Sequence, residues 1–447
     1  MATETISGAK VLGSFYDEAA YTLLFSQQQG AVTAAYGFVG GQPVYSVLQS
    51  GEALYAADTG VACRTLELAA KTGNPVVPFY NTKGAKLEEG QAAVAAAATW
   101  NAAIAAVSGV VPQISVVVGV CGASAALAAA SADLCIVAKD AQFFLSSPFL
   151  AEAGGDKLEN AGTAEFAAKA GIAALVAEDV EDAVAKAAKL VALLPSNNLS
   201  LPGEFEYDEP AAAVDTAAYT AEKAIAALAD SGSQQEVFAG FGSAVSTVFA
   251  TVEGNVAGFV ATAGPGKTIC RASAEKAARF VRLCDAFSVP VVTLVNTEGF
   301  AQSSSGDVAG GIRAAARLVS TYADATTAKV AVYTGKAVGT AYTAFSSADL
   351  TVAMEGAVIA PAEPTAVVSV LYRQQIEESG KPVAAETAAL AREYEARQAS
   401  AEAALQNGLA DFVAAPEALR ATVANALGIL ASKRARRLPK KHGNMPL

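Results

Sequence analysis

The chain has 447 residues, with 31 lysines and arginines against 43 aspartates and glutamates, which gives a formal net charge of −12. That length exceeds one typical hydrophobic core, so two domains of roughly 200 residues each are expected. The acidic balance argues against a nucleic-acid partner, which needs a basic face, and it is of the kind that keeps a protein soluble.

Cysteine usage and hydropathy both predict a cytoplasmic protein. The five cysteines contain no CxxC pair, and an odd number cannot all pair within one chain, so a reducing compartment is expected. Residues 1–14 lack the features of a signal peptide. The charge-free stretch 90–132 suggests a membrane span as an alternative, but it is rich in alanine and its apolar core, 114–119, is short. A buried helix followed by a buried parallel strand explains this stretch better.

Strands and helices are expected to alternate along the first half. Residues 14–25 (SFYDEAAYTLLF) are predicted as a helix, and 34–48 as two strands joined by a Gly-Gly turn. A helix at 64–71 should close at Gly73. Further along, the order is strand 75–81, loop 82–90, helix 91–108, a strand running into the turn 121–126, two short strands within 134–144, and a helix from 178 that Pro195 stops.

The second half repeats that order. Strands at 240–252 and 255–263 flank a turn at Glu253 and Gly254, a helix is expected at 274–287, and strand 290–296 runs into loop 297–306. The carboxyl-terminal region is predicted as two helical segments, 385–408 and 416–434, followed by a basic tail.

Matched segments indicate an internal duplication. Residues 74–84 and 289–299 share Pro, Val, Val, Asn, Thr and Gly at the same places. In the first copy Asn81 lies 52 residues before Asp133, and in the second copy Asn296 lies 53 residues before Asp349, each aspartate belonging to a Ser-Ala-Asp-Leu motif. The copies therefore keep register over a whole strand–helix–strand unit. We expect a first domain at 1–200, a linker and helix at 201–232, and a second domain at 233–447.

The stretch 110–134 and its weaker copy at 327–350 each read as a β-branched strand, a small-residue turn and a helix. The turns CGASAA (121–126) and AVGTAY (337–342) place free N–H groups at a helix start, where the helix dipole favours an anion. Small residues also let a helix pack closely on a sheet. Because the turns recur at matched register, we interpret them as a pair of oxyanion holes.

Other candidate sites are weaker. The single histidine, His442, lies in the tail, which removes Ser-His-Asp and Cys-His catalysis and most zinc sites unless the tail itself carries them. Cys121 is therefore expected in the core. The segment AGPGKT (263–268) resembles the end of a nucleotide-binding loop, but alanine stands at 261 where its first glycine should be. Lys83 and Lys86 are either solvated charges or phosphate ligands.

Several segments resemble the carboxyltransferase family of biotin-dependent enzymes. This family includes the β subunits of propionyl-CoA and related acyl-CoA carboxylases and the carboxyltransferase subunits of methylmalonyl-CoA and glutaconyl-CoA decarboxylases. The most specific segments are KAARFVRLCDAF (276–287) and the ending KKHGNMPL (440–447). Together with GFVGGQPVYSVLQ, KTGNPVVPFYNTKGAKLEEG, VVPQISVVVGVCG and GGIRAAARLVSTYADATTAKVAVYTGKAVGTAY, they span nearly the whole chain.

The resemblance implies an α/β fold of two tandem crotonase-like domains, each a ββα superhelix. In that family the first domain binds acyl-CoA and the second binds carboxybiotin, and the active site forms between the first domain of one subunit and the second domain of another. Carboxybiotin releases CO2, and the ureido anion left behind takes the α-proton of the CoA thioester. One oxyanion hole holds the thioester enolate and the other the biotin oxygen, so no histidine base is needed.

Residues that match the family motifs give the expected site. The enolate hole is expected at Ala123, Ser124 and Ala125, and the biotin hole at Gly339, Thr340 and Ala341. Contacts to the CoA thioester and biotin are expected at Lys83, Gly84, Ala85, Lys86, Gly122, Gly299 and Phe300, and no metal is expected.

Both turns depart from the family. The usual Cys-Ala-Gly-Gly-Ala is Cys-Gly-Ala-Ser-Ala at 121–125, and the usual Tyr-Gly-Gly-Ala is Val-Gly-Thr-Ala at 338–341. Backbone N–H groups survive a change from glycine wherever φ is negative, although a side chain then points near the ligand. The family loops SGGARxxEG and DVPGFxPG read NTKGAKLEEG and NTEGFAQSSSG here.

Partners follow from the same resemblance. No AMKM-type attachment site is present, so biotin must be carried by a separate carrier protein, and the substrate is a short acyl-CoA of the methylmalonyl/propionyl, glutaconyl or acetyl/malonyl type. A homo-oligomer, dimer or hexamer, or a hetero-oligomer with a related carboxyltransferase subunit is expected. A membrane decarboxylase subunit is a further partner, which would hold the chain at the inner face of the membrane.

Two alternatives stay open. A catalytically weakened paralogue could pair with a complete carboxyltransferase subunit, because the turn glycines are replaced. A crotonase-type hydrolase or isomerase would leave the second half and the tail unexplained.

Overall fold

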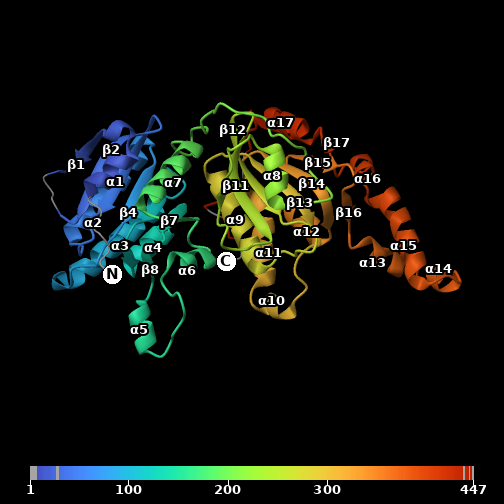
Figure 1. The fold of residues 1–447 in the computed structure, drawn as a ribbon, viewed down its shortest axis with the longest axis horizontal. Helices are drawn as coiled ribbons and strands as arrows, with labels where there is room; N and C mark the ends of the chain where they lie inside the picture. The colour runs from blue at the N-terminus through green and yellow to red at the C-terminus, as the bar shows by residue number, and fades with distance from the viewer. Residues whose placement is uncertain (1–7, 27–29, 436–437, 442, 445–447) are drawn as a thin grey trace. The chain divides into compact units, whose positions relative to one another are not determined.

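The computed structural model describes residues 8–26, 30–435, 438–441 and 443–444. The sole histidine, His442, and the end of the basic tail lie outside the described residues. The chain divides into two compact units (Figure 1): unit 1 is Met1–Gly203 with Phe238–Phe241, and unit 2 is Glu204–Val237 with Gly242–Leu447.

Unit 1 is built on a seven-stranded sheet with the order β1-β2-β3-β4-β5-β7-β9. Its first three strands are antiparallel, and from β3 onward neighbours run parallel because each crossover passes through a helix. A short parallel pair, β6 and β8, lies apart from this sheet. The strands are β1 (Tyr21–Leu24), β2 (Val32–Val39), β3 (Gln42–Gln49), β4 (Val76–Tyr80), β5 (Ile114–Val117), β6 (Val120–Gly122), β7 (Leu134–Ala138), β8 (Gln142–Phe144) and β9 (Leu175–Ala177).

Helices cover both faces of this sheet. Phe79 of β4 faces Phe15 of α1 with ring centroids 5.3 Å apart, whereas the next residue, Tyr80, stacks on Trp100 of α3 at 5.7 Å. Successive side chains of a strand point to opposite faces, so α1 and α3 lie on opposite sides. The helices are α1 (Gly8–Phe15), α2 (Ala56–Thr72), α3 (Gln91–Val107), α4 (Ser124–Ala130), α5 (Pro148–Ala153), α6 (Ala164–Lys169) and α7 (Val180–Leu193).

Unit 2 has a sheet with the order β10-β11-β12-β13-β14-β15-β17, and β16 pairs with β14 beyond this path. As in unit 1, the first three strands are antiparallel and the later pairings are parallel. The strands are β10 (Gln235–Val237), β11 (Val245–Val252), β12 (Asn255–Thr262), β13 (Val291–Thr297), β14 (Lys329–Val338), β15 (Leu350–Met354), β16 (Val358–Ala360) and β17 (Phe412–Ala414).

The helices of unit 2 also occupy both faces of its sheet. Phe249 of β11 packs against Phe280 of α9 with ring centroids 4.9 Å apart. Its neighbour Val248 belongs to the buried apolar cluster that contains Ile225 of α8 and Val423 of α17. The first helices are α8 (Ala221–Leu228), α9 (Arg271–Ala286), α10 (Ser304–Val308), α11 (Gly311–Asp324) and α12 (Thr340–Phe345).

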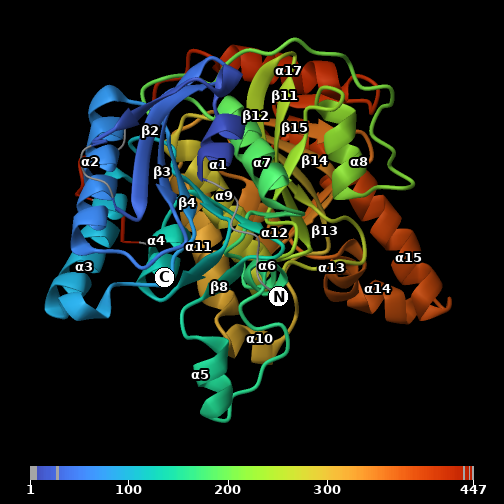
Figure 2. The ribbon, with the colours of Figure 1, turned by 60° about the vertical axis from the view of Figure 1, so that its left-hand side comes forward.

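The remaining helices end unit 2. Figure 2 shows α13, α14 and α15 as an arm, and this arm has a small apolar cluster of its own that includes Val368, Ile376 and Leu390. A π-helical turn, Glu395–Ala399, follows α15. The helices are α13 (Pro364–Leu371), α14 (Arg373–Glu378), α15 (Val383–Tyr394), α16 (Ala401–Gln406) and α17 (Leu419–Leu430).

The stretch that suggested a membrane span folds as helix, strand and helix. Across the described ranges, no helix is both long and apolar enough to cross a bilayer. All four residues of β5 are buried, because parallel strands flank β5 on both edges and helices cover its faces. The expected buried strand is therefore confirmed. The expectation of a buried helix is wrong, because α3 buries one face only, through Ala93, Trp100, Ile104 and Val107, and the rest of the helix is largely exposed.

One expected helix is wrong. Residues 14–25 do not form a single helix, because α1 ends at Phe15 and Glu18 and Ala19 have positive φ values of 53° and 55°. A helix cannot continue through such residues. The segment after them, Tyr21–Leu24, instead adds an antiparallel edge strand to β2.

A carboxylate holds the hairpin turn of each unit. In unit 1, Asp17 accepts hydrogen bonds from the N–H groups of Gly40 and Gly41, both at 2.9 Å, and Asp17 is exposed. In unit 2, Asp230 accepts from the two N–H groups of the β11–β12 turn at 3.0 and 2.8 Å. Asp230 is buried and pairs with Arg420 of α17 at 2.7 Å. The two turns are thus held alike in different surroundings.

A second matched arrangement lies at the start of β5 and of β14. The N–H of Gln113 and the N–H of Lys329 each donate to a carboxylate at 2.8 Å, that of Asp133 and Asp349 respectively. The side chain of Gln113 donates to the carbonyl of Ile104 at 3.1 Å, near the end of α3. The ammonium of Lys329 donates to two carbonyls near the end of α11, at 2.6 and 2.9 Å.

Candidate active site

Each unit has a helix that begins directly after a residue with positive φ. In unit 1 this residue is Ala123 (φ 51°, ψ −124°), between β6 and α4, and in unit 2 it is Gly339 (φ 57°, ψ −123°), between β14 and α12. The N–H of Ala123 donates to the carbonyl of Phe144 at 3.0 Å, and that of Gly339 donates to Ala360 at 2.9 Å. The turns share one backbone conformation, although only one carries a side chain.

The N–H groups that follow each turn are unpaired. Ser124 and Ala125 open α4, Thr340 and Ala341 open α12, and among the described residues none of these four N–H groups has an acceptor. The first turn of a helix leaves such donors free, and the helix dipole makes them favourable to an oxygen anion. The N–H groups of Ala123 and Gly339 are already bonded, so they are not available to a ligand.

A loop next to the turn of unit 1 offers one more donor. Leu54 donates its N–H to the carbonyl of Gly84 at 2.8 Å and accepts from the N–H of Lys86 at 2.8 Å. These bonds occupy one side of the loop. The N–H of Ala85 lies between them, points to the other side, and has no acceptor in the part of the chain that is described.

The corresponding loop of unit 2 has the same bonds. Ile269 donates its N–H to Gly299 and accepts from the N–H of Ala301, each at 2.9 Å. The N–H of Phe300, between them, has no acceptor within the described ranges. Among the described residues, each unit therefore has a free N–H donor on its loop and free N–H donors in the first turn of its helix, which include Ser124 and Ala125 in unit 1 and Thr340 and Ala341 in unit 2.

Neighbouring parallel strands bring loop and turn to the same end of each sheet. In unit 1 the N–H of Thr82, in the loop after β4, donates to Val120 of β6 at 2.8 Å. In unit 2 Thr297 pairs in register with Ala337, two residues before the turn. The carboxyl ends of adjacent parallel strands are where open α/β sheets place their ligand sites.

The lysines expected to bind phosphate have other contacts in this structure. Lys83 pairs with both carboxylate oxygens of Glu52, at 3.0 and 2.9 Å, and both side chains are exposed. The ammonium of Lys86 lies 5.1 Å from the ring centroid of Tyr55, a cation–π contact. Both lysines lie on the loop that carries the free N–H of Ala85.

Beneath the turn of unit 1 the structure is tightly packed. A Cβ on Gly122 would lie 2.4 Å from the Phe144 ring, so a larger residue there would force this ring to move. Cys121 is fully buried, and burial together with the nearby Cys135 thiol raises the pKa of Cys121 well above its usual range. A neutral, buried thiol is no nucleophile, and the expectation that Cys121 belongs to the core is confirmed.

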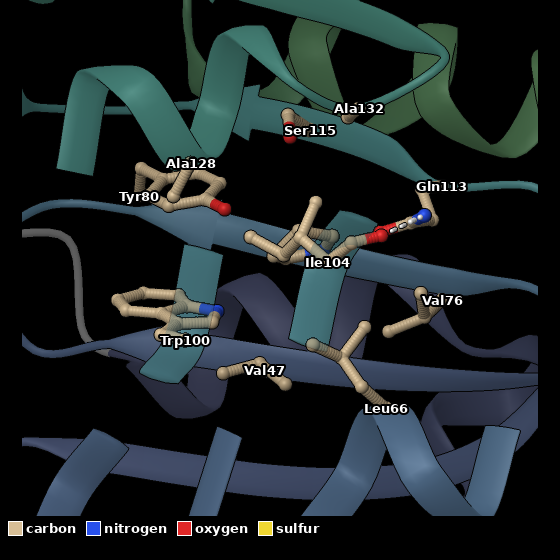
Figure 3. Close-up of a pocket in the computed structure, with 11 residues that line it drawn as sticks. Val47, Leu66, Val76, Tyr80, Trp100, Ile104, Gln113, Ser115, Ala128 and Ala132 are labelled. Atoms are coloured by element: carbon tan, nitrogen blue, oxygen red, sulfur yellow. Dashed lines mark hydrogen bonds between the residues drawn. The ribbon is translucent and has the colours of Figure 1, made fainter. Parts of the chain in front are cut away.

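A cavity of about 10 Å³ lies deeper in unit 1, between the sheet and helices α2, α3 and α4. Figure 3 shows Tyr80 and Trp100 at one end and the hydrogen bond from Gln113 to Ile104 at the other. The hydroxyl groups of Tyr80 and Ser115 are buried and have no hydrogen-bond partner among the residues that the structure describes. Its size suits no more than one water molecule, so this cavity is not a substrate pocket.

Sequence reasoning missed two asparagines that hold the turns. Asn81 accepts a hydrogen bond on Oδ1 from the N–H of Val120 at 3.2 Å, and Asn296 accepts from Lys336 at 3.2 Å. Both asparagines stand at identical places in the two matched segments, 74–84 and 289–299. That identity was the signal available in the sequence.

The segment 263–268 joins β12 to α9 as a loop. Gly264 and Gly266 have positive φ values of 98° and 77°, and α9 begins only at Arg271. The carbonyl of Lys267 accepts a hydrogen bond from the Thr297 hydroxyl at 3.2 Å. The loop thus contacts the segment that carries the free donor of unit 2.

A family comparison explains this arrangement. The model of the carboxyl transferase domain matches residues 13–445. The chain therefore belongs to the carboxyl transferase family, whose biotin-dependent members are enzymes, and the resemblance drawn from the sequence is confirmed.

Individual relatives agree with this assignment. The chain is 30% identical to the methylmalonyl-CoA decarboxylase subunit alpha of Propionigenium modestum, covering 93% of this chain and 86% of the relative. It is 36% identical to the propionyl-CoA carboxylase beta chain of Saccharopolyspora erythraea, covering 86% of this chain and 76% of the relative.

A solved structure shows the same fold. The chain superposes on transcarboxylase 12S with a TM-score of 0.91 at 29% identity, covering 98% of this chain and 92% of that one. That crystal structure is described as a hexamer with methylmalonyl-coenzyme A and methylmalonic acid bound. The expected crotonase-like α/β fold is confirmed.

Proposed function

We propose that this chain is the carboxyltransferase subunit that moves a carboxyl group between biotin and a short-chain acyl-CoA. The observation that carries the proposal is the set of free N–H donors that each unit holds at the carboxyl end of its sheet. Two donor sets suit a reaction in which one oxygen on each of two substrates gains negative charge. They stabilise that charge more in the transition state than in the ground state.

In unit 1 the donors for a thioester enolate would be Ala85, Ser124 and Ala125. Their N–H groups are free among the described residues, and the pKa of Cys121 excludes a competing thiolate. Lys83 and Lys86 stand on the same loop and would meet the phosphates of CoA, with Lys83 exchanging Glu52 for the ligand. Ala123 and Gly122 would shape the turn rather than donate.

In unit 2 the donors for the biotin carbonyl oxygen would be Phe300, Thr340 and Ala341. Biotin, bound to a separate carrier protein, supplies or accepts the carboxyl group. The free backbone groups named at this site are N–H donors, which fits a carbonyl oxygen as their partner. Gly299 and Gly339 would keep the backbone in the conformation that directs these donors.

Relatives support the substrate class. One acts on methylmalonyl-CoA and another on propionyl-CoA, as their names state. We propose a substrate of that short, branched or unbranched kind, and an oligomer as the working form, since transcarboxylase 12S assembles as a hexamer. If the chain works in the decarboxylase direction, we propose a membrane decarboxylase subunit as a further partner, which would hold the chain at the inner face of the membrane.

The matched parts of the two units also support a common origin. The donor loops, the Asp-held hairpin turns and the positive-φ residues before α4 and α12 occur once in each unit at corresponding places. We propose that the units arose by duplication, with the first domain, 1–200, serving the acyl-CoA and the second, 233–447, serving biotin, joined through 201–232.

The test is carboxyl transfer by the purified chain. Labelled carboxyl on a biotin carrier protein should move to propionyl-CoA or a related short acyl-CoA, and hydrolysis or double-bond isomerisation of the same thioesters should be absent. Failure to transfer to any thioester of a panel from acetyl-CoA to glutaconyl-CoA contradicts the proposal.

A second candidate function is a weakened paralogue that pairs with a complete carboxyltransferase subunit. Ala123 favours it, because this alanine adopts a positive φ that costs an L-residue about 1 to 3 kcal/mol. Purification from the native host distinguishes the two functions. An active homo-oligomer supports the carboxyltransferase function. A complex with another carboxyltransferase subunit that keeps its activity when the turns at Ala123 and Gly339 are altered supports the weakened paralogue.

A further inference from the structure

We propose that two Asn–Thr pairs, Asn81–Thr82 and Asn296–Thr297, are positioning residues that set the distance between the loop donor and the helix donors of each oxyanion hole. The inference rests on the proposed function and adds to it the residues that hold each hole open. In each pair the asparagine side chain holds the strand that runs into the turn, and the threonine side chain holds the donor loop.

The asparagine binds the strand at the point where the chain heads for the turn. Its Oδ1 accepts from Val120 in unit 1 and from Lys336 in unit 2, both at 3.2 Å. A Cβ added to the preceding glycine would lie 2.2 Å from Asn81 in unit 1 and 2.4 Å from Asn296 in unit 2. The side chain is therefore in direct contact with this strand, and a shift of either one moves the other.

The threonine binds the loop from its other side. In unit 1 the hydroxyl of Thr82 donates to the carbonyl of Glu52 at 2.9 Å and accepts from the N–H of Gly84 at 3.1 Å. Gly84 immediately precedes the free donor, Ala85. Thr82 is buried, with 2% of its surface exposed, so the loop cannot exchange this bond for one with water.

Thr297 makes the corresponding bonds in unit 2. Its hydroxyl donates to the carbonyl of Lys267 at 3.2 Å and accepts from the N–H of Gly299 at 3.3 Å. Gly299 precedes the free donor Phe300, and Thr297 is 1% exposed.

Different side chains anchor the backbone of each asparagine. The N–H of Asn81 donates to Oε1 of Gln49 at 3.0 Å, and that of Asn296 donates to the Thr262 hydroxyl at 2.7 Å. Gln49 and Thr262 end the last antiparallel strand of each sheet, β3 and β12. The Asn–Thr pair is the same in both units although its anchor differs.

The consequence is catalytic because an oxyanion hole works only at short range. Donors must lie about 2.7–3.1 Å from the developing oxyanion, and a displacement of about 1 Å costs roughly a hundredfold in rate. A pair that fixes both sides of the hole thus affects transition-state binding more than ground-state binding of the CoA moiety, which would depend on the side chains of Lys83 and Lys86.

The test compares two CoA derivatives bound to the full chain. One ends in a nitroalkane, whose nitronate anion mimics a thioester enolate, and the other ends in a neutral ketone of the same length. Asn81→Leu and Thr82→Val keep the side-chain volume and remove the hydrogen bonds. Each should weaken nitronate binding by about tenfold or more and ketone binding by less than about twofold.

Matched variants make the result specific. Thr82→Ser keeps the hydroxyl and should restore nitronate binding, and Asn74→Leu, at the opposite end of β4, should change neither affinity. Asn296→Leu should leave both affinities unchanged but lower kcat for carboxyl transfer about tenfold, with the KM for the acyl-CoA within about twofold.

Folding is followed separately in unit 1. Trp100 is the only tryptophan and stacks on Tyr80, the residue before Asn81, so its fluorescence reports an intact unit 1. If Asn81→Leu loses that signal, the isosteric Thr82→Val carries the test.

The outcomes separate this inference from the proposed function. If the unaltered chain binds the nitronate more tightly than the ketone, and both Asn81→Leu and Thr82→Val keep this preference, the inference is overturned and the proposed function is not. Equal loss of ketone and nitronate binding in Thr82→Val also overturns it, because that is the result of a merely structural role. An unaltered chain that transfers no carboxyl group and does not prefer the nitronate overturns the proposed function first.

Discussion

Asp17 of unit 1 and Asp230 of unit 2 accept the same two hydrogen bonds from a hairpin turn, but only Asp230 is buried and paired with an arginine. Gln113 and Lys329 show the same difference. The neutral amide of Gln113 donates to a carbonyl near the end of α3, whereas the charged ammonium of Lys329 donates to carbonyls near the end of α11. Unit 2 therefore depends on buried charge where unit 1 depends on neutral or exposed groups. A buried charge is costly to leave without its partner.

The largest expected effect is at Asp230. Asp230→Asn leaves the guanidinium of Arg420 without its carboxylate in a buried place, and we expect unit 2 to lose about 3 kcal/mol of unfolding free energy. Asp17→Asn removes an exposed carboxylate, and unit 1 should lose less than about 1 kcal/mol. Hydrogen exchange resolved by peptide measures each unit, and equal losses would break the comparison.

The pH dependence should show the same difference. Burial alone would raise the pKa of Asp230, but hydrogen bonds from Thr251, Arg420 and the turn N–H groups outweigh it and lower the pKa below its ordinary value. A lowered pKa means that the folded state prefers the ionised form, so this stability is present above the unfolded pKa and is lost as the pH falls through the folded pKa. When the unfolding free energy of unit 2 is measured against pH in the acid range, its slope should be smaller in Asp230→Asn than in the unaltered chain.

Next in size is Lys329. Lys329→Met leaves the carbonyls of Tyr322 and Ala325 without their donor, and unit 2 should lose about 2 to 3 kcal/mol. Lys329→Gln, which copies unit 1, should recover part of that loss. The matched change Gln113→Leu removes one neutral bond and should cost unit 1 about 1 kcal/mol, measured by Trp100 fluorescence during denaturation.

A smaller loss is expected at Gly339. Gly339→Ala puts a side chain at φ 57°, where its Cβ would lie 3.1 Å from the carbonyl oxygen of Pro361. The strain should destabilise unit 2 by about 2 kcal/mol. If the melting temperature of unit 2 falls by less than about one degree, this turn tolerates a side chain as easily as the turn at Ala123 in unit 1 does.

The smallest effect is a gain. Ala123→Gly makes the first turn like the second and removes the strain of an alanine at φ 51°, so the unfolding free energy of unit 1 should rise by about 1 kcal/mol. A loss of stability would mean that the alanine side chain is held by contacts that outweigh its strain. Denaturation followed by Trp100 fluorescence measures the change.

The sequence was sufficient wherever a local pattern decides the structure. Pro195 ends α7 as expected, and Asp179 caps its first turn by accepting the N–H of Asp182 at 2.8 Å. The Asn, Thr and Gly residues shared by the two matched segments were enough to locate both donor loops along the chain. Buried apolar runs such as 114–117 were recognised as parallel strands because nothing polar alternates in them.

What the sequence did not predict depends on contacts between distant residues. Ala123 combines a positive φ with an N–H bond to the distant Phe144, and alanine normally avoids that conformation. Within the expected sets, Ala123 and Gly339 use their own N–H groups for bonds inside the protein, whereas the N–H groups of the other members have no acceptor among the described residues. The end of the first helix was also not predicted. Glu18 and Ala19, which follow it, have positive φ values, and neither residue type marks a helix stop in a sequence.

The cluster that joins α8 and α17 in unit 2 has a consequence for synthesis on the ribosome. The sheet of unit 1 is complete once β9 has emerged, at Ala177, and α7 follows by Leu193, so most of this unit can fold while the rest of the chain is being made. Unit 2 must wait, because Leu419 and Val423 share one core with Ile225 and Arg420 closes on Asp230. A nascent unit 2 therefore exposes its apolar sheet face until translation has almost ended, and this is the interval in which a chaperone would be needed most.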